Sequence, residues 1–305
     1  MSGNSRRGYN RVDKQPHQAP ASPLNPLRHA LSDEHYALIE PLLPARNRPG
    51  HPWKDHRLVL NAILWVLHTG AQWRDLPRDT YGPWQTVYER FNRWSKDGTW
   101  ARIIEALHIR LDQKGQIDWD LFCIDGSSVR AGRDAAGASP TDGSSAEPRD
   151  HALGRSRGGF GSKIHLVCDG NGLPMAVRIT AGQRHESTQF QAVLKQVRVP
   201  RKRGRPRCRP KRVAGDKGYS YPHLRRALRR RGIKAVIPTK KNQRRLPGFE
   251  KETYRRRNVV ERCIGWLKDR RRLATRFEKL AENFLAMVQL AMLERLLKAL
   301  LPDTA

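Results

Sequence analysis

The chain has 305 residues, and 59 Lys and Arg against 29 Asp and Glu give it a formal net charge of +30. No apolar run is long enough for a membrane helix, and the segment from Met1 to Leu24 lacks the apolar stretch of a secretory signal, so we expect a cytoplasmic protein without a membrane partner. The 4 cysteines show no zinc-ligand or disulfide spacing, and the excess of positive charge predicts a polyanionic partner.

The N-terminal part divides into an arm and a group of helices. Residues 1–30 are rich in Pro, Asn, Gln and Arg and show no periodicity, which predicts a flexible basic arm. Over residues 31–115, apolar spacing predicts four helices, which begin at Ser32, Leu58, Pro83 and Trp100. With Lys and Arg on the faces that do not pack, these helices suit an all-α, helix-turn-helix-like DNA-binding domain. The alternative is a bundle that only packs against the rest of the chain.

From Ile117 the pattern changes to a mixture of strands and helices. We predict strands over 119–124, 160–168, 174–180, 212–215 and 235–237, and helices over 188–197, 222–231, 259–273 and 282–300. The string Asp169-Gly170-Asn171-Gly172 predicts a hairpin turn, because such a turn needs positive φ. Residues 126–158, rich in Gly, Ser, Ala and Asp, are predicted to form a long mobile loop. The order indicates an α/β fold with a mixed sheet flanked by helices over residues 116–302.

Two carboxylates stand where predicted strands end. Asp125 follows the apolar run 119–124, and Asp216 follows the strand 212–215. Sites in open α/β sheets form at the carboxyl ends of strands, so both carboxylates would reach one metal ion if the two strands are neighbours. Carboxylates that close need a cation to stay ionised, and Mg²⁺ or Mn²⁺ suits oxygen ligands. The alternative is that each Asp only caps the helix or turn that follows it.

A third carboxylate, Glu261, belongs to a polar stripe on a predicted helix. The stripe consists of Tyr254, Arg257, Glu261 and Lys268, which are spaced to share one helical face. The apolar residues beside the stripe would pack on the sheet, so Glu261 lies at the rim of the buried face and can turn towards Asp125 and Asp216. An Arg-rich, solvated helix face is the other interpretation.

These residues carry a resemblance to a known family. The motif Tyr-x2-Arg-x3-Glu-x6-Lys resembles the signature of bacterial insertion-sequence transposases of the DDE class, and the nearest group is the insertion-sequence-five type. The strings Ile124-Asp125-Gly126-Ser127 and Gly215-Asp216-Lys217-Gly218-Tyr219 resemble the same family. So do the N-terminal strings Trp73-Arg74-Asp75-Leu76-Pro77 and Pro83-Trp84-Gln85-Thr86-Val87-Tyr88. The similarity runs from about Leu31 to Leu300.

The resemblance implies an RNase H-like catalytic domain, with the first Asp on the first strand, the second just after the fourth strand and the Glu on a later helix. Asp125, Asp216 and Glu261 would then be the catalytic ligands of two Mg²⁺ or Mn²⁺ ions. Two such ions activate a water and then a 3′-hydroxyl, so the same site cleaves a DNA strand and joins it to target DNA. The implied protein is a nucleoid-associated bacterial transposase, working on DNA as a homodimer or a larger assembly.

Several basic residues are expected to bind double-stranded DNA, at the terminal inverted repeats or at the target. Tyr254, Arg257 and Lys268 would contact phosphates or the cleaved end, together with Arg255 and Arg256. The segment Lys202–Arg207 resembles an AT-hook, whose Arg203, Arg205 and Arg207 would enter a minor groove. The alternative is a linker that follows phosphates without entering a groove. The triplets Arg255–Arg257 and Arg270–Arg272 flank the Glu261 helix, so we expect a DNA backbone across it.

Other candidates have ordinary explanations. His165 and His185 could lie near the site, and His185-Glu186 resembles a position of the same family, but lone histidines are more often structural. The hairpin accounts for Asp169. The aromatic residues Trp84, Tyr88, Phe91 and Trp94 are spaced for the core rather than for base stacking. We therefore predict a DNA transposase. The alternatives are a catalytically inactive DNA-binding repressor derived from a transposase, against which the intact triad argues, and a metal-dependent nuclease without strand transfer.

Overall fold

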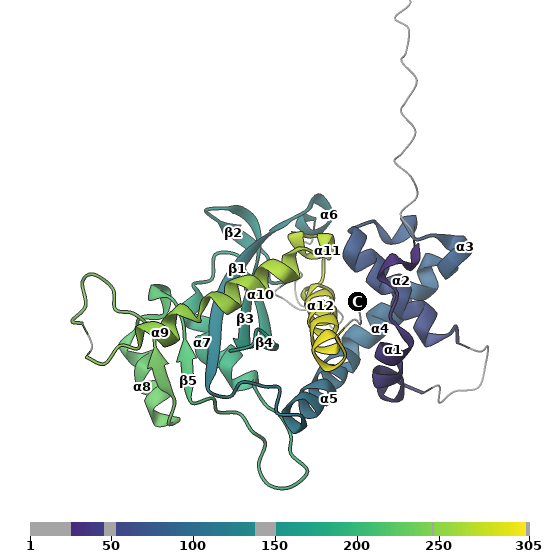
Figure 1. Cartoon of the computed structure of the whole chain (residues 1–305). Coiled ribbons are helices and arrows are strands. Elements are labelled where there is room, and N and C mark those ends of the chain that lie inside the picture. Colours follow the sequence, from purple (N-terminus) through teal and green to yellow (C-terminus); the bar gives the residue numbers. More distant parts are fainter. Residues whose placement is uncertain (1–25, 46–52, 138–150, 246, 303–305) are drawn as a thin grey trace, which may run out of the picture.

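The computed structural model describes residues 26–45, 53–137, 151–245 and 247–302 (Figure 1). Most of the predicted basic arm lies outside these residues, as does the centre of the predicted 126–158 loop. A group of N-terminal helices stands on one side of the molecule and a mixed sheet on the other, and the C-terminal helix α12 (Ala281–Leu300) lies between them (Figure 1).

The four predicted N-terminal helices are present, and the structure adds the short helix α3 (Arg78–Tyr81). The predicted four are α1 (Asp33–Ile39), α2 (His56–Thr69), α4 (Trp84–Lys96) and α5 (Thr99–Gln113). Ser32 caps α1 by accepting a hydrogen bond from the His35 N–H, and α2 ends at Gly70 with a φ of 70°. Phe91 and Trp94 are fully buried, which confirms their place in the core, whereas Trp84 and Tyr88 pack against its edge.

The sheet has five main strands: β1 (Leu121–Ala131), β3 (Gly159–Asp169), β4 (Pro174–Ala181), β5 (Arg212–Ala214) and β6 (Lys234–Val236). β3 pairs antiparallel with β1 and with β4, while β5 pairs parallel with β1 and with β6. Two short strands, β2 (Gly154–Ser156) and β7 (Thr275–Arg276), extend β3 and β1. The resulting order, β4-β3-β1-β5-β6, confirms the RNase H-like fold.

The helices of this part are α6 (Arg133–Ala136), α7 (Glu186–Gln196), α8 (Pro222–Arg230), α9 (Lys251–Arg255), α10 (Asn258–Lys268) and α11 (Arg271–Ala274). α7 packs on β3 and β4, and α10 packs on β1 and β3. α12 contacts α5 and β4, so a continuous buried core joins the N-terminal helices to the sheet. The domain boundary near residue 115 stays a prediction. No helix in the described part of the chain could span a membrane.

Two predicted boundaries are wrong. Asp125 does not end its strand, because β1 continues to Ala131 through residues that were predicted to begin a loop. Their Gly and Ser content is overridden by pairing with β3, which extends to Arg130. The predicted helix 259–273 is interrupted, since Arg270 is extended at φ −76° and ψ 113° and separates α10 from α11.

Candidate active site

The candidate site lies where the central sheet opens. β5 pairs with β1 from Leu121 to Cys123, and β7 pairs with it only at Arg130 and Ala131. Between these points, β1 has no strand partner on that side within the described residues. Asp125 lies in this opening, beyond the last residue of β1 that pairs with β5. Ligands of open α/β sheets bind at such points, where neighbouring parallel strands separate.

Asp216 reaches the same opening from the adjacent strand. The two strands are neighbours, which the sequence had left open, because Cys123 of β1 pairs with Ala214 of β5. Each Asp follows its paired residue by two positions. Asp216 also caps the short 3-10 turn Lys217–Tyr219, where its Oδ1 accepts a hydrogen bond of 2.8 Å from the Gly218 N–H. This cap uses one of the two carboxylate oxygens of Asp216, so the residue can cap the turn and still offer an oxygen to a metal ion.

The environment of Asp125 disfavours its negative charge. Burial raises the pKa of Asp125 to about 6, and the charges of Glu186 and Asp216 push in the same direction. A hydrogen bond of 2.9 Å from the Gly126 N–H to Oδ1 and the charge of Arg257 oppose this rise. A cation beside such a carboxylate would relieve the repulsion among the three acidic groups.

Arg257 joins Asp125 to the third predicted ligand. Glu261 lies in the first turn of α10, with 53% of its side chain exposed, and pairs with Arg257 Nη2. Nη1 of the same guanidinium lies 3.7 Å from Asp125 Oδ2. Among the described residues, no three His, Cys, Asp or Glu side chains are arranged to hold a metal ion. Arg257 provides the positive charge between Asp125 and Glu261.

The residues around the opening nevertheless fit a hard divalent cation in their chemistry. Asp125, Asp216 and Glu261 offer carboxylate oxygens, which Mg²⁺ and Mn²⁺ prefer. Tyr219 is fully buried, and its hydroxyl has no hydrogen-bond partner among the described residues. Burial and the charges of Glu186, Asp125 and Asp216 raise the pKa of Tyr219, so its phenol stays neutral beside these carboxylates.

Lys268 and Tyr254 are the other two residues of the polar stripe. Lys268 Nζ donates a hydrogen bond of 2.9 Å to the Ser128 carbonyl, which lies in the part of β1 that β5 leaves unpaired. The Tyr254 ring lies 5.4 Å from the Phe249 ring and 5.6 Å from the Arg257 guanidinium. Arg257 and Lys268 therefore contact β1 at either end of the stretch from Asp125 to Ser128.

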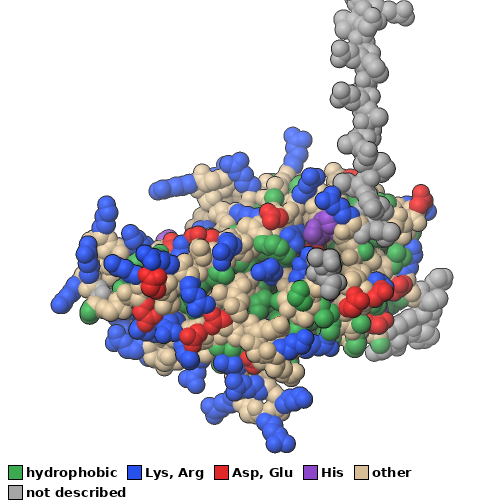
Figure 2. All heavy atoms as spheres, viewed as in Figure 1, with side chains coloured by type: hydrophobic (Ala, Val, Ile, Leu, Met, Phe, Trp, Pro, Cys, Tyr) green, Lys and Arg blue, Asp and Glu red, His purple; other side chains and the backbone are tan. Residues whose placement is uncertain are grey.

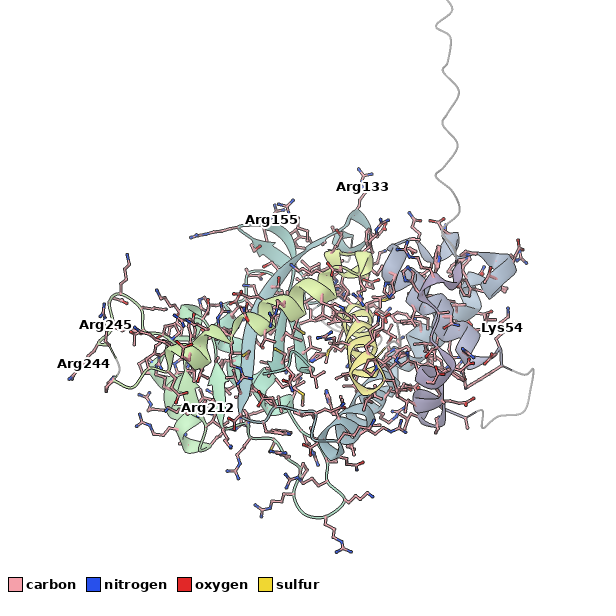
Figure 3. All side chains as sticks on the ribbon, viewed as in Figure 1. Lys54, Arg133, Arg155, Arg212, Arg244 and Arg245 are labelled. Carbon is pink, nitrogen blue, oxygen red and sulfur yellow. The ribbon has the colours of Figure 1, made fainter. Side chains whose placement is uncertain are left out.

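The predicted DNA-binding arginines divide into exposed and engaged side chains. Arg203 and Arg205 are exposed, whereas Arg207 turns inward, 3.1 Å from Asp112 and 4.4 Å above the Trp119 ring. Arg255 is exposed beside Glu252, and Arg256 pairs with Asp118 at 2.6 Å. Positive charge also gathers at places that the sequence analysis did not single out. Figure 2 shows Lys and Arg along much of the outline of one face, and Figure 3 shows Arg133, Arg155, Arg244 and Arg245 projecting outwards.

The second arginine triplet differs from expectation. Arg270 and Arg272 are buried and pair with Glu294 and Glu278, so only Arg271 of this triplet is exposed. Arg270 and Arg272 are therefore not available to a DNA backbone that crosses α10. Arg270 and Arg272 each pair with a carboxylate, because a buried charge without a partner would destabilise the fold.

The remaining candidates have structural roles, with one exception. His165 is buried and hydrogen-bonded with Thr180, His185 caps α7, and Asp169 accepts three backbone hydrogen bonds in its hairpin. The exception is Glu186, which the sequence indicated only through the resemblance of His185-Glu186 to a family position. Its Oε1 lies 3.3 Å from Lys163 Nζ, and it lies against Gly126.

Two family models and several curated proteins show which proteins this chain resembles. A family model described as "Transposase DDE domain" matches residues 119–293, and one described as "Putative transposase of IS4/5 family" matches residues 31–104. A putative transposase for insertion sequence element IS402 of Burkholderia cepacia is 38% identical over 170 residues, covering 55% of this chain and 71% of that protein. An uncharacterized 16.2 kDa protein of the same element and organism is 39% identical over 107 residues, covering 33% and 73%. Among solved structures, a piggyBac transposase synaptic complex with hairpin DNA aligns with a TM-score of 0.33 and 16% identity, covering 70% of this chain and 48% of that one.

Proposed function

The chain belongs to the transposase DDE domain family, and we propose that it cleaves the ends of an insertion sequence and transfers the cleaved strand to target DNA. The observation that carries this proposal is the sheet opening, where adjacent parallel strands deliver Asp125 and Asp216 two residues beyond their last pair. Glu261 of α10 lies on the other side of the Arg257 guanidinium that contacts Asp125, which supports a place for it near the opening.

Asp125, Asp216 and Glu261 are proposed to hold two Mg²⁺ or Mn²⁺ ions. When bound, a pair of such ions supplies charge stabilisation to both the attacking and the leaving oxygen of an in-line phosphoryl transfer. Glu261 must leave Arg257 to join the other two carboxylates. The released Arg257 guanidinium can then donate hydrogen bonds to a DNA phosphate, so every charge stays paired.

DNA contact is proposed along the outside of α9 and α10 and at the exposed basic loops. Arg255 is exposed there, and Tyr254, Arg256 and Lys268 belong to the same helical segment, while Arg203 and Arg205 are exposed on the loop before β5. Arg207 and Arg256 contribute less, because Asp112 and Asp118 already neutralise them. We propose that residues 31–115 recognise the terminal inverted repeats while residues 116–302 carry the chemistry, and that a homodimer or larger assembly holds two DNA ends.

A cleavage assay tests this function. Purified protein is incubated with Mg²⁺ and labelled duplexes that carry the inverted repeats flanking the gene, and cut and joined products are separated. We expect both products, and we expect Asp125→Asn to reduce them by roughly a thousandfold, since metal-ion stabilisation contributes several kcal/mol. Asp134→Asn, on the exposed surface of α6, is the matched control and should leave both products unchanged.

The alternatives give different products. Binding without cleavage in any divalent cation would favour a repressor, and cleavage without joining would favour a nuclease. Full activity of Asp125→Asn would refute the assignment of the site.

A further inference from the structure

Glu186 approaches the opening of the sheet from the face opposite to α10. A Cβ added to Gly126 would lie 2.6 Å from Glu186 Cγ and 2.8 Å from Oε1, so Gly126 presents its side-chain position to Glu186. Successive residues of a strand point to opposite faces, which places the Asp125 side chain on the other face, towards Arg257. At this point β1 has no strand partner on the β5 side within the described residues, so both carboxylates can reach the same open edge of β1.

Glycine at position 126 is what allows this approach. Any larger residue would occupy the space of the Glu186 side chain, since a contact of 2.6 Å is far below van der Waals distance. The first residue of α7 is Glu186 itself, and His185 caps this helix, so the start of α7 fixes the position of the Glu186 backbone beside β1. Gly126 thus makes room for a carboxylate next to Asp125.

Both outer carboxylates are held by a cation of the chain. Lys163 of β3 lies 3.3 Å from Glu186 Oε1, and both side chains are largely buried, with 16% and 24% exposed. Arg257 holds Glu261 in the same manner from the opposite face. Close by, the buried Tyr219 hydroxyl lacks a partner among the described residues. Lys163 and Arg257 each neutralise a carboxylate, Glu186 and Glu261 respectively, that would otherwise repel Asp125.

We propose that Glu186 is a fourth acidic residue of the site, which leaves Lys163 and binds the divalent cation together with Asp125. The inference rests on the proposed function, because it takes Asp125 to be a metal ligand. It adds a ligand from α7 to those from β1, β5 and α10. The released Lys163 ammonium then remains at the site as a charge for the DNA phosphate.

Metal affinity tests the proposal without any need for activity. Mn²⁺ is titrated calorimetrically into the full-length protein without DNA, and thermal unfolding of each variant checks that it is folded. Glu186→Gln is expected to weaken Mn²⁺ binding by roughly ten- to a hundredfold, as loss of a group that supports a metal site does. Gly126→Ala should have the same effect, because the added methyl displaces Glu186 while leaving every charge in the chain unchanged.

Lys163→Met is the matched control, since it breaks the same ion pair but keeps the carboxylate. It should leave Mn²⁺ affinity equal or tighter. Equal weakening by Lys163→Met and Glu186→Gln would assign Glu186 a purely structural role and overturn the proposal. If Asp125→Asn weakens binding and Glu186→Gln does not, the proposed function stands and this inference fails. If neither variant changes binding, the metal site itself is wrong.

Discussion

Replacing Glu294 by glutamine is expected to destabilise the whole protein, because this carboxylate connects three parts of the fold. Glu294 lies on α12 with 10% of its side chain exposed. Its Oε1 lies 2.6 Å from His68 Nε2 on α2, and its Oε2 accepts a hydrogen bond of 3.1 Å from Arg270, between α10 and α11. Although burial opposes ionisation, the His68 hydrogen bond and the charge of Arg270 hold the pKa of Glu294 below its usual value.

The size of the effect follows from burial. Removing one partner of a buried ion pair costs about 3–5 kcal/mol, because the other charge stays buried without compensation. Glutamine keeps one acceptor oxygen, so we expect the lower end, about 3 kcal/mol of the free energy of unfolding. At about 2 to 4 °C per kcal/mol, the melting temperature should fall by about 6 to 12 °C.

Differential scanning calorimetry at pH 7.5 measures this change. Glu282→Gln is the control, because Glu282 lies on the same helix and is only partly buried. The double variant Arg270→Met/Glu294→Gln should lose less than the sum of its single changes, since no buried arginine is then left unpaired. Equal melting temperatures for Glu294→Gln and Glu282→Gln would refute the reasoning.

Two further predictions concern charge. Burial lowers the pKa of His108 to about 4 from its ordinary value of 6.5, so the native state binds fewer protons than the unfolded chain between these values. Its stability contribution is therefore complete above pH 6.5, and urea unfolding should show a loss of about 2 kcal/mol at pH 5, which His108→Phe removes. Arg257→Met removes a positive charge beside the proposed metal site and should tighten Mn²⁺ binding about tenfold while reducing DNA cleavage. Weaker Mn²⁺ binding would show that Arg257 organises the carboxylates rather than competing with the metal.

Local patterns account for most elements of this fold. Ser32 and Gly70 mark helix ends because capping depends on a few neighbouring atoms, and the Asp169–Gly172 turn follows from the positive φ at Gly172. The same holds for the choice of Asp125 and Asp216, since an apolar strand followed by a carboxylate is visible in the sequence. The resemblance in the Glu261 motif supplied the third residue.

Contacts between residues that are distant in the chain decided the other features of the fold and the site. The sequence by itself determined most of the segments that form strands and helices, because apolar period, caps and turns act over a few residues. Only the tertiary structure decided that β1 continues past Asp125, that Arg270 turns inward to Glu294, and that Glu186 lies against Gly126. Strand pairing and the partner of a buried charge depend on residues that are distant in the chain, so no local pattern records them.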